Sequence, residues 1–357
     1  MKARPSASPA ASAQAAVTSA RGAASSAQAF FGARPYLAAS AVAAAALAVS
    51  ALVNHRLAKK AERDNPPTGR FLVVDGVRLH YVEQGEGEPL VLLHGNGSMI
   101  QDFETSGLVA MAATRYRVIA FDRPGYGHSE RPRSTIWTPQ AQARLIREAL
   151  VQLDVRRATI LGHSWGASVA MSLALDHPEL VGGLVLASGY YYPTVRADVV
   201  MLSGPAIPGF GDVIRYTISP ILSRLMWPLF LAKIFGPASV PAKFGGFPKE
   251  MAFRPSQIRA SAAESALMVP NAWSEHDRYG ELAMPVAIVA GEEDRLIDID
   301  HQSARLHRDV PHSSFHHVRG VGHMVHQNAT KVVMAAIDEV AGSEKPKTKA
   351  RTLRKAA

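Results

Sequence analysis

The sequence contains no cysteine among its 357 residues. Disulfide bonds, thiolate nucleophiles and cysteine-bound metal ions are therefore excluded, while the redox state of the compartment stays open. Charged residues are also scarce, at 19 % of the chain, whereas apolar residues make up 47 %. This composition supplies enough apolar side chains for a large core and carries too little charge for a chain that is disordered throughout.

The central part of the chain lacks the positive charge that a nucleic-acid partner requires. The net charge of the whole chain is +9, but residues 1–66 hold eight Lys and Arg against two acids, and residues 343–357 hold six against one. The stretch between these two ends is therefore slightly acidic, and we expect no nucleic-acid partner. Residues 343–357 are predicted to form a basic disordered tail, with docking to anionic lipid as the alternative.

One long stretch near the start of the chain has no charge at all. Residues 1–35 are rich in Ala, Ser and Gly without a sustained apolar period, which predicts a disordered leader. Tyr36–Val53 then holds 18 residues without a charge. A helix of this length measures about 27 Å, close to the hydrocarbon thickness of a bilayer. We therefore interpret residues 36–54 as a single-pass membrane anchor, which makes the membrane an expected partner.

Two other interpretations of this stretch stay open. One is a secretory signal with Val49-Ser50-Ala51 as the cleavage tripeptide, and the other is a soluble alanine-rich helix. Basic residues flank the stretch on both sides, with a small excess after it. This excess favours, slightly, a location of the following domain on the cytoplasmic side of the membrane.

The rest of the chain has the pattern of an α/β protein. Residues 55–69 are predicted to form a linker, and from residue 70 short apolar runs alternate with segments of helical period. This alternation is typical of a mostly parallel sheet with helices on both faces. Residues 191–280 are too many for a loop and contain helical stretches, so we expect an inserted helical cap. Residues 70–190 and 281–342 then form the two parts of the core.

The segment Gly162-His163-Ser164-Trp165-Gly166 matches the pattern G-x-S-x-G. It lies directly between a predicted strand, Ala158–Leu161, and a predicted helix, Ala167–Leu175. A turn this sharp exposes the side chain of Ser164, and glycine at 162 and 166 removes the Cβ atoms that would otherwise clash. Ser164 is therefore the candidate nucleophile.

A second glycine-rich turn, His94-Gly95-Asn96-Gly97, follows the apolar run Leu90–Leu93. Gly95 and Gly97 allow the backbone to turn sharply and leave a backbone N–H free. We expect the N–H groups of Asn96 and Trp165 to form a two-donor oxyanion hole. An ordinary strand-to-helix turn is the alternative.

Two later loops supply a candidate acid and a candidate base. Asp294 follows a predicted strand in the segment 290–294 (AGEED), and its rivals for the role are Glu292, Glu293 and Asp298. His323 lies in the glycine-flanked loop 320–324 (GVGHM). An acid at this place accepts Nδ1–H of the base and stabilises the imidazolium.

Several further histidines crowd the end of the chain, namely His312, His316, His317 and His326. The chain lacks the H-E-x-x-H spacing and has no cysteine. We therefore predict that no metal is bound.

The chain order Ser164, Asp294, His323 is typical of a nucleophile-elbow hydrolase. On these motifs, residues 70–342 resemble the α/β-hydrolase superfamily, in the branch with a helical cap. The segment 122–129 (DRPGYGHS) is similar to that family's D-x-x-G-x-G-x-S turn. The resemblance implies an eight-stranded core, the roles of nucleophile, acid and base for these three residues, and no cofactor.

The residue type at position 164 limits the reaction class. Relatives that open epoxides or remove halides resemble this chain but use aspartate there, whereas serine suits acyl transfer. Aromatic and apolar residues in the predicted cap favour a small to medium hydrophobic ester-like substrate. The alternatives are hydrolysis of a C–C bond, a haloperoxidase-like activity, and a catalytically silent scaffold that binds a partner.

Overall fold

The computed structural model describes residues 9–342, so the predicted basic tail at 343–357 lies outside the described residues. The chain divides into two compact units, residues 1–53 and residues 54–357. The first unit is helical from Pro9 onward, and the second contains the sheet.

Helix α1 extends over Pro9–Asp64, which corrects two predictions. The leader is helical from Pro9 and not disordered, and the predicted linker 55–69 is wrong for residues 55–64. The reason is local, because alanine, lysine, arginine and glutamate are strong helix formers that need no tertiary packing. The helix ends where Asn65 donates its backbone and side-chain N–H groups to the carbonyl of Ala61, just before two prolines. The segment Tyr36–Asp64 is long and apolar enough to cross a membrane.

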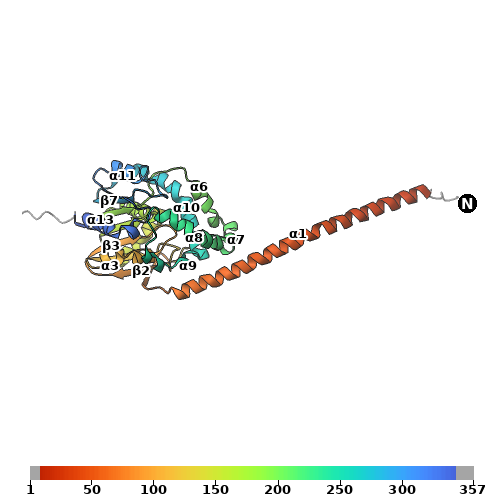
Figure 1. The fold of residues 1–357 in the computed structure, drawn as a ribbon, viewed down its shortest axis with the longest axis horizontal. Helices are drawn as coiled ribbons and strands as arrows, with labels where there is room; N and C mark the ends of the chain where they lie inside the picture. The colour runs from red at the N-terminus through yellow and green to blue at the C-terminus, as the bar shows by residue number, and fades with distance from the viewer. Residues whose placement is uncertain (1–8, 343–357) are drawn as a thin grey trace, which may run out of the picture. The chain divides into compact units, whose positions relative to one another are not determined.

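The second unit is built on one eight-stranded sheet in the order β1-β2-β4-β3-β5-β6-β7-β8 (Figure 1). Strands β1, β2 and β4 pair antiparallel, and the other pairings are parallel, so the sheet is mixed and mostly parallel. The strands are β1 Arg70–Val74, β2 Val77–Gln84, β3 Glu88–Leu93, β4 Tyr116–Phe121, β5 Ala158–His163, β6 Val181–Ala187, β7 Val286–Gly291 and β8 Ser314–Val318. The eight-stranded α/β-hydrolase core expected from the sequence is therefore confirmed.

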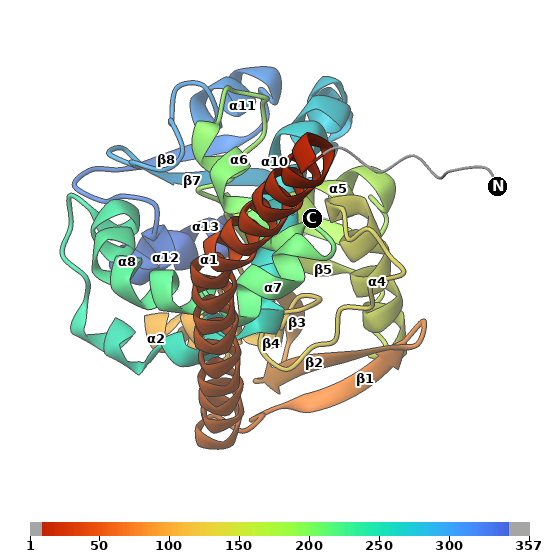
Figure 2. The same ribbon diagram turned by 90° about the vertical axis from the view of Figure 1, so that its right-hand side faces the viewer.

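Helices cover both faces of this sheet (Figure 2). In β3, Val91 and Leu93 point to one core cluster while Leu90 and Leu92 point to the other, because successive side chains alternate across a strand. Helices on the first face are α4 (Pro139–Gln152), α5 (Trp165–Asp176) and α11 (Ser303–Asp309). Those on the second face are α2 (Ile100–Ser106), α3 (Leu108–Ala112), α12 (Val325–Asn328) and α13 (Thr330–Gly342).

The cap between β6 and β7 consists of helices joined by loops and contains no strand, as predicted (Figure 1). Its longest helix, α10, has a fully buried glutamate, Glu264, that accepts hydrogen bonds from Arg123 at 2.5 and 3.1 Å. The cap elements are α6 Ala197–Leu202, η1 Gly204–Ala206, α7 Phe210–Tyr216, α8 Ser219–Phe235, η2 Ala242–Gly246, α9 Lys249–Ala252, α10 Pro255–Glu275 and η3 His276–Glu281.

Candidate active site

Ser164 occupies a sharp bend between β5 and α5. Its backbone has φ 53° and ψ −119°, a conformation that L-residues other than glycine rarely adopt. A Cβ atom on Gly162 would overlap the carbonyl of Gly166, and one on Gly166 would overlap the carbonyl of Leu93. Both positions therefore require glycine, and the strain at Ser164 is the strain expected of a nucleophile elbow.

Asp294 and His323 form a buried pair. His323 donates its Nδ1–H to Asp294 Oδ2 at 2.7 Å, and both side chains are almost fully buried. The other carboxylate oxygen of Asp294 accepts the backbone N–H groups of Leu296 and Ile297 at 2.8 and 2.9 Å. The carboxylate is thus held in one orientation, which in turn orients the imidazole ring.

The three rival acids have other partners. Glu292 lies 3.4 Å from Arg319, and Glu293 accepts the backbone N–H of Gly320. Asp298 pairs with His301 at the surface. Of these four carboxylates, the structure brings Asp294 to His323.

The predicted oxyanion turn lies beside the elbow. A Cβ atom on Gly95 would lie 3.1 Å from both Ser164 Cβ and His163 Nδ1, so the two loops nearly touch. The side chain of Asn96 is bound to the cap, because its amide donates to Ser261 O and Ser265 Oγ at 3.2 Å each. Trp165 is the first residue of α5, and an N–H at that position has no partner within its helix. The structure thus brings the two predicted turns together, and the role of these two N–H groups as oxyanion donors stays a prediction.

His163, which the sequence analysis assigned no role, ties the elbow to the base. This fully buried imidazole donates its Nε2–H to the carbonyl of His323 at 3.1 Å. Burial, together with the nearby His326 and His323, holds the pKa of His163 well below its ordinary value. The ring is therefore neutral and acts as a hydrogen-bond donor at a fixed position.

A second buried carboxylate, Asp102 at the start of α2, extends this connection. It lies 3.0 Å from His326 Nε2 and accepts hydrogen bonds from Ser98 Oγ and Gln327 Nε2 at 2.9 and 2.8 Å. Burial raises the pKa of Asp102, but the neighbouring His326 outweighs burial, and the net pKa lies below the ordinary value. We use the name buried brace for Asp102, His163 and His326. These residues connect the segment after the oxyanion turn, the bend at Ser164 and the loop that carries His323.

The buried brace is also the one group in residues 36–342 whose ligand atoms lie close enough together to hold a metal ion, within 4.8 Å of one another. Two imidazoles and a carboxylate are ligand types that zinc accepts. His163 donates to the His323 carbonyl through Nε2, and Asp102 accepts two hydrogen bonds. Among the described residues, the other ring nitrogen of His163, Nδ1, has no hydrogen-bond partner, so the absence of a bound metal stays a prediction. Elsewhere, His316 pairs with Glu339, and His312 pairs with the carbonyl of Met284.

Arg123 is a further residue that the sequence analysis did not identify. It donates to the carbonyls of His94 and Gly95 at 2.7 and 2.9 Å, and to Glu264 on the cap. Burial and the adjacent guanidinium lower the pKa of His94 to about 4, so this imidazole is neutral and accepts the backbone N–H of Arg123. The cap and the oxyanion turn are thereby fixed to the same side chain.

Asp294→Asn is expected to slow the reaction of Ser164 with a fluorophosphonate probe by a factor of roughly 10³ to 10⁴, because the amide favours the wrong tautomer of His323. The rate of labelling at neutral pH measures this effect. Asp298→Asn is the matched control and should label at the rate of the unmodified chain. The reverse ranking would assign the acid to Asp298.

His163→Leu is expected to lower the labelling rate about 10²-fold, because loss of the Nε2–H frees the loop that carries His323. His163→Gln, whose side-chain amide can donate from a similar place, should recover most of the rate. Equal losses in both variants at matched thermal stability would show that His163 merely fills space.

Comparisons with known proteins agree with this geometry. The model of the family described as alpha/beta hydrolase fold matches residues 88–329. An uncharacterised hydrolase, YugF of Bacillus subtilis, is 29 % identical over 273 residues, which cover 75 % of this chain and 95 % of that protein. A 2-hydroxymuconate semialdehyde hydrolase of Pseudomonas putida is 29 % identical over 276 residues, covering 74 % of this chain and 90 % of that one.

The fold is also found among solved structures. The enol-lactonase of Burkholderia xenovorans superposes with a TM-score of 0.63 at 17 % identity, covering 76 % of this chain and all of the other. The sheet order, the strained serine and the family match all agree, so the resemblance seen in the sequence is confirmed. The chain belongs to the α/β-hydrolase family and is a hydrolase of that fold.

Proposed function

We propose that the protein is a serine hydrolase that cleaves ester or lactone bonds of small to medium hydrophobic substrates through an acyl-enzyme on Ser164. The observation that carries this proposal is the 2.7 Å hydrogen bond between Asp294 and His323 in the loops next to the strained Ser164. An aspartate nucleophile, which halide and epoxide chemistry uses in this fold, is replaced here by serine.

In the proposed reaction, Ser164 Oγ attacks the substrate carbonyl while His323 Nε2 takes the serine proton. Asp294 stays ionised and stabilises the imidazolium through Nδ1–H. The backbone N–H groups of Asn96 and Trp165 stabilise the oxyanion of the tetrahedral intermediate. His323 then protonates the leaving group, and water hydrolyses the acyl-enzyme by the same steps in reverse.

A second candidate reaction is the hydrolysis of a C–C bond next to a carbonyl. The relative from Pseudomonas putida is named as a 2-hydroxymuconate semialdehyde hydrolase, and it aligns over most of both chains. Serine, histidine and the oxyanion donors would serve this reaction as well, so the substrate decides between the two.

An ester series tests the proposal. The full chain should hydrolyse p-nitrophenyl esters and react with a fluorophosphonate at Ser164, whereas Ser164→Ala should do neither and keep its thermal stability. A series of acyl chains from two to twelve carbons reports the size of the acyl site. If Ser164 stays unlabelled and no ester turns over, the chain is a binding scaffold; turnover of a vinylogous diketone alone would favour C–C hydrolysis.

We also propose that Tyr36–Val53 anchors the protein in a membrane. Its support is the uncharged apolar sequence and the absence of burial within this helix in the structure. The full chain is expected to stay in the pellet when membranes are extracted with alkaline carbonate. Ala45→Arg, at the centre of the segment, costs about 2.5–3.5 kcal/mol of insertion free energy and should release much of the protein. Release of the unmodified chain would rule out a spanning helix.

A further inference from the structure

The outer surface of the cap is strongly apolar. We use the name cap face for the outer surface of α6, α7 and α8, where large apolar side chains are unusually exposed. Met201 is 83 % exposed, Phe210 62 %, Leu225 70 % and Leu229 63 %. Large apolar side chains that are exposed together on neighbouring helices often mark an interaction site, so a partner is expected to cover them.

Helix α8 shows what kind of partner is required. Apolar residues lie on all sides of this helix, its charged residues are Arg224 and Lys233, and only Pro220, Ile234 and Phe235 are buried in the protein. A helix that is apolar on every side belongs in a core or in lipid. Helices α7 and α8 together have the composition of a membrane span but are bent by 62° to one another. A bent pair of short apolar helices on a folded surface suits partial insertion at the bilayer surface.

The chain itself connects the cap face to the proposed anchor. Asn54 directly follows Val53, the last residue of the uncharged stretch. Its side-chain amide donates to the carbonyls of Tyr216 and Thr217, both at 3.0 Å, where α7 ends. Arg224 on α8 donates to Asn54 Oδ1 at 3.2 Å. The point at which the chain leaves the apolar segment is therefore hydrogen-bonded to the hinge between α7 and α8.

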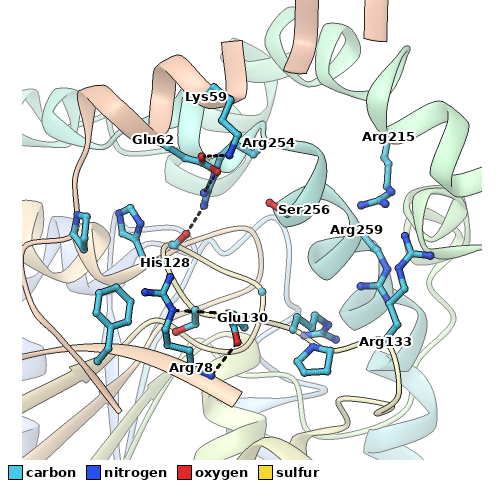
Figure 3. A pocket seen from close by; sticks show the side chains of 17 residues that line it. Lys59, Glu62, Arg78, His128, Glu130, Arg133, Arg215, Arg254, Ser256 and Arg259 are labelled. Atoms are coloured by element: carbon cyan, nitrogen blue, oxygen red, sulfur yellow. Dashed lines mark hydrogen bonds and ion pairs between the residues drawn. The ribbon is translucent and has the colours of Figure 1, made fainter. Parts of the chain in front are cut away.

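A basic pocket of about 820 Å³ lies close to this junction (Figure 3). Seven lysine and arginine side chains line it, against two glutamates. Lys59 is six residues beyond Val53, a rise of about 9 Å along a helix, which matches the depth of lipid headgroups. Arg215 of α7 lines the same pocket, so the pocket and the cap face share one helix.

Arg259 shows that this pocket favours an anion. Burial lowers the pKa of Arg259, and the positive charges of Arg133, Arg131 and Arg215 lower it further. Two acids oppose these arginines: Asp212 pairs with Arg133 and Arg215, and the buried Glu264 lies 3.7 Å from Arg131. Figure 3 shows the guanidinium groups of Arg133, Arg215 and Arg259 on one side of the pocket. A phosphate group would relieve this repulsion.

We infer that the cap face rests on an anionic phospholipid bilayer, with α7 and α8 among the lipid chains and the basic pocket around a phospholipid headgroup. This inference rests on the proposed membrane anchor. It identifies the lipid surface as a second contact besides the spanning helix, and it places the cap of the hydrolase against the layer that holds hydrophobic esters.

The absence of cysteine permits a direct test, because a single introduced cysteine is the only labelling site. Full-length Leu225→Cys and Leu229→Cys, each labelled with a nitrobenzoxadiazole dye, are reconstituted into vesicles of phosphatidylglycerol and phosphatidylcholine. Lipids carrying a nitroxide on the acyl chain should quench the dye several-fold more than at the control Val151→Cys, which is 54 % exposed on α4 of the core.

The outcomes separate the inference from the anchor. If the chain resists carbonate extraction but dyes at 225 and 229 are quenched no more than the dye at 151, the inference is overturned and the anchor stands. Release by carbonate removes the anchor and the inference together. Burial of the dyes without lipid quenching, and only at high protein density, would assign the cap face to a second copy of the chain and overturn the inference.

The pocket is tested with soluble lipids on the full chain in a nonionic detergent. Dihexanoyl-phosphatidylglycerol should raise the melting temperature, and dihexanoyl-phosphatidylcholine should raise it less. In Arg259→Gln, about fivefold more phosphatidylglycerol should be needed for the same rise in melting temperature, as expected for the loss of one basic group at an anionic surface. Arg147→Gln, on α4 in the core, is the matched control and should leave it unchanged. Equal stabilisation by inorganic phosphate, or no change in Arg259→Gln, would overturn the headgroup assignment.

Discussion

The buried ion pair between Arg123 and Glu264 is the interaction on which the site depends. Both side chains are fully buried, and removing one would leave an uncompensated charge, at a typical cost of about 3–5 kcal/mol. Glu264 also accepts hydrogen bonds from Tyr126 and Gln142, so the cap helix α10 is fastened to two core segments. Because Arg123 holds the carbonyls of His94 and Gly95 as well, the seating of the cap and the shape of the oxyanion turn are set together.

Buried polar groups also fix the loops below the cap. Asp122, which opens the D-x-x-G-x-G-x-S turn, accepts the backbone N–H groups of Ile100 and His128 at 3.0 Å each and pairs with His80. A Cβ atom on Gly127 would overlap the Asp122 carboxylate, which explains the glycine of that motif. The carboxyl ends of five parallel strands, β3, β4, β5, β7 and β8, thus carry separate loops that are held in place by buried polar groups as well as by the sheet.

Whether a feature could be predicted from the sequence depends on how far apart in the chain the interacting residues lie. The bend at Ser164 depends on glycines two residues to either side, and the structure has it as predicted. Arg123 and Glu264 are 141 positions apart, and no local pattern pairs them. His163 and His326 lie near Ser164 and His323 in the sequence, but no sequence motif indicates a role for either of them. The linker prediction was wrong for residues 55–64 because these residues are strong helix formers, and the prolines at 66 and 67 end the helix only after Asp64.

The carboxylates that hold the framework share one electrostatic property. The pKa values of Asp102, Asp122 and Glu264 are all below the ordinary range, because His326, His80 and Arg123 outweigh the effect of burial. A carboxylate with a lowered pKa in the folded state keeps its stabilising charge until the pH falls through that lower value. The buried imidazoles of His94 and His163 act in the opposite sense, because their pKa values lie below the ordinary value in the folded state. As the pH falls below about 6.5, the unfolded chain takes up protons that these two rings do not bind in the folded state, so acid weakens the loops around Ser164 through their histidines before it reaches their carboxylates.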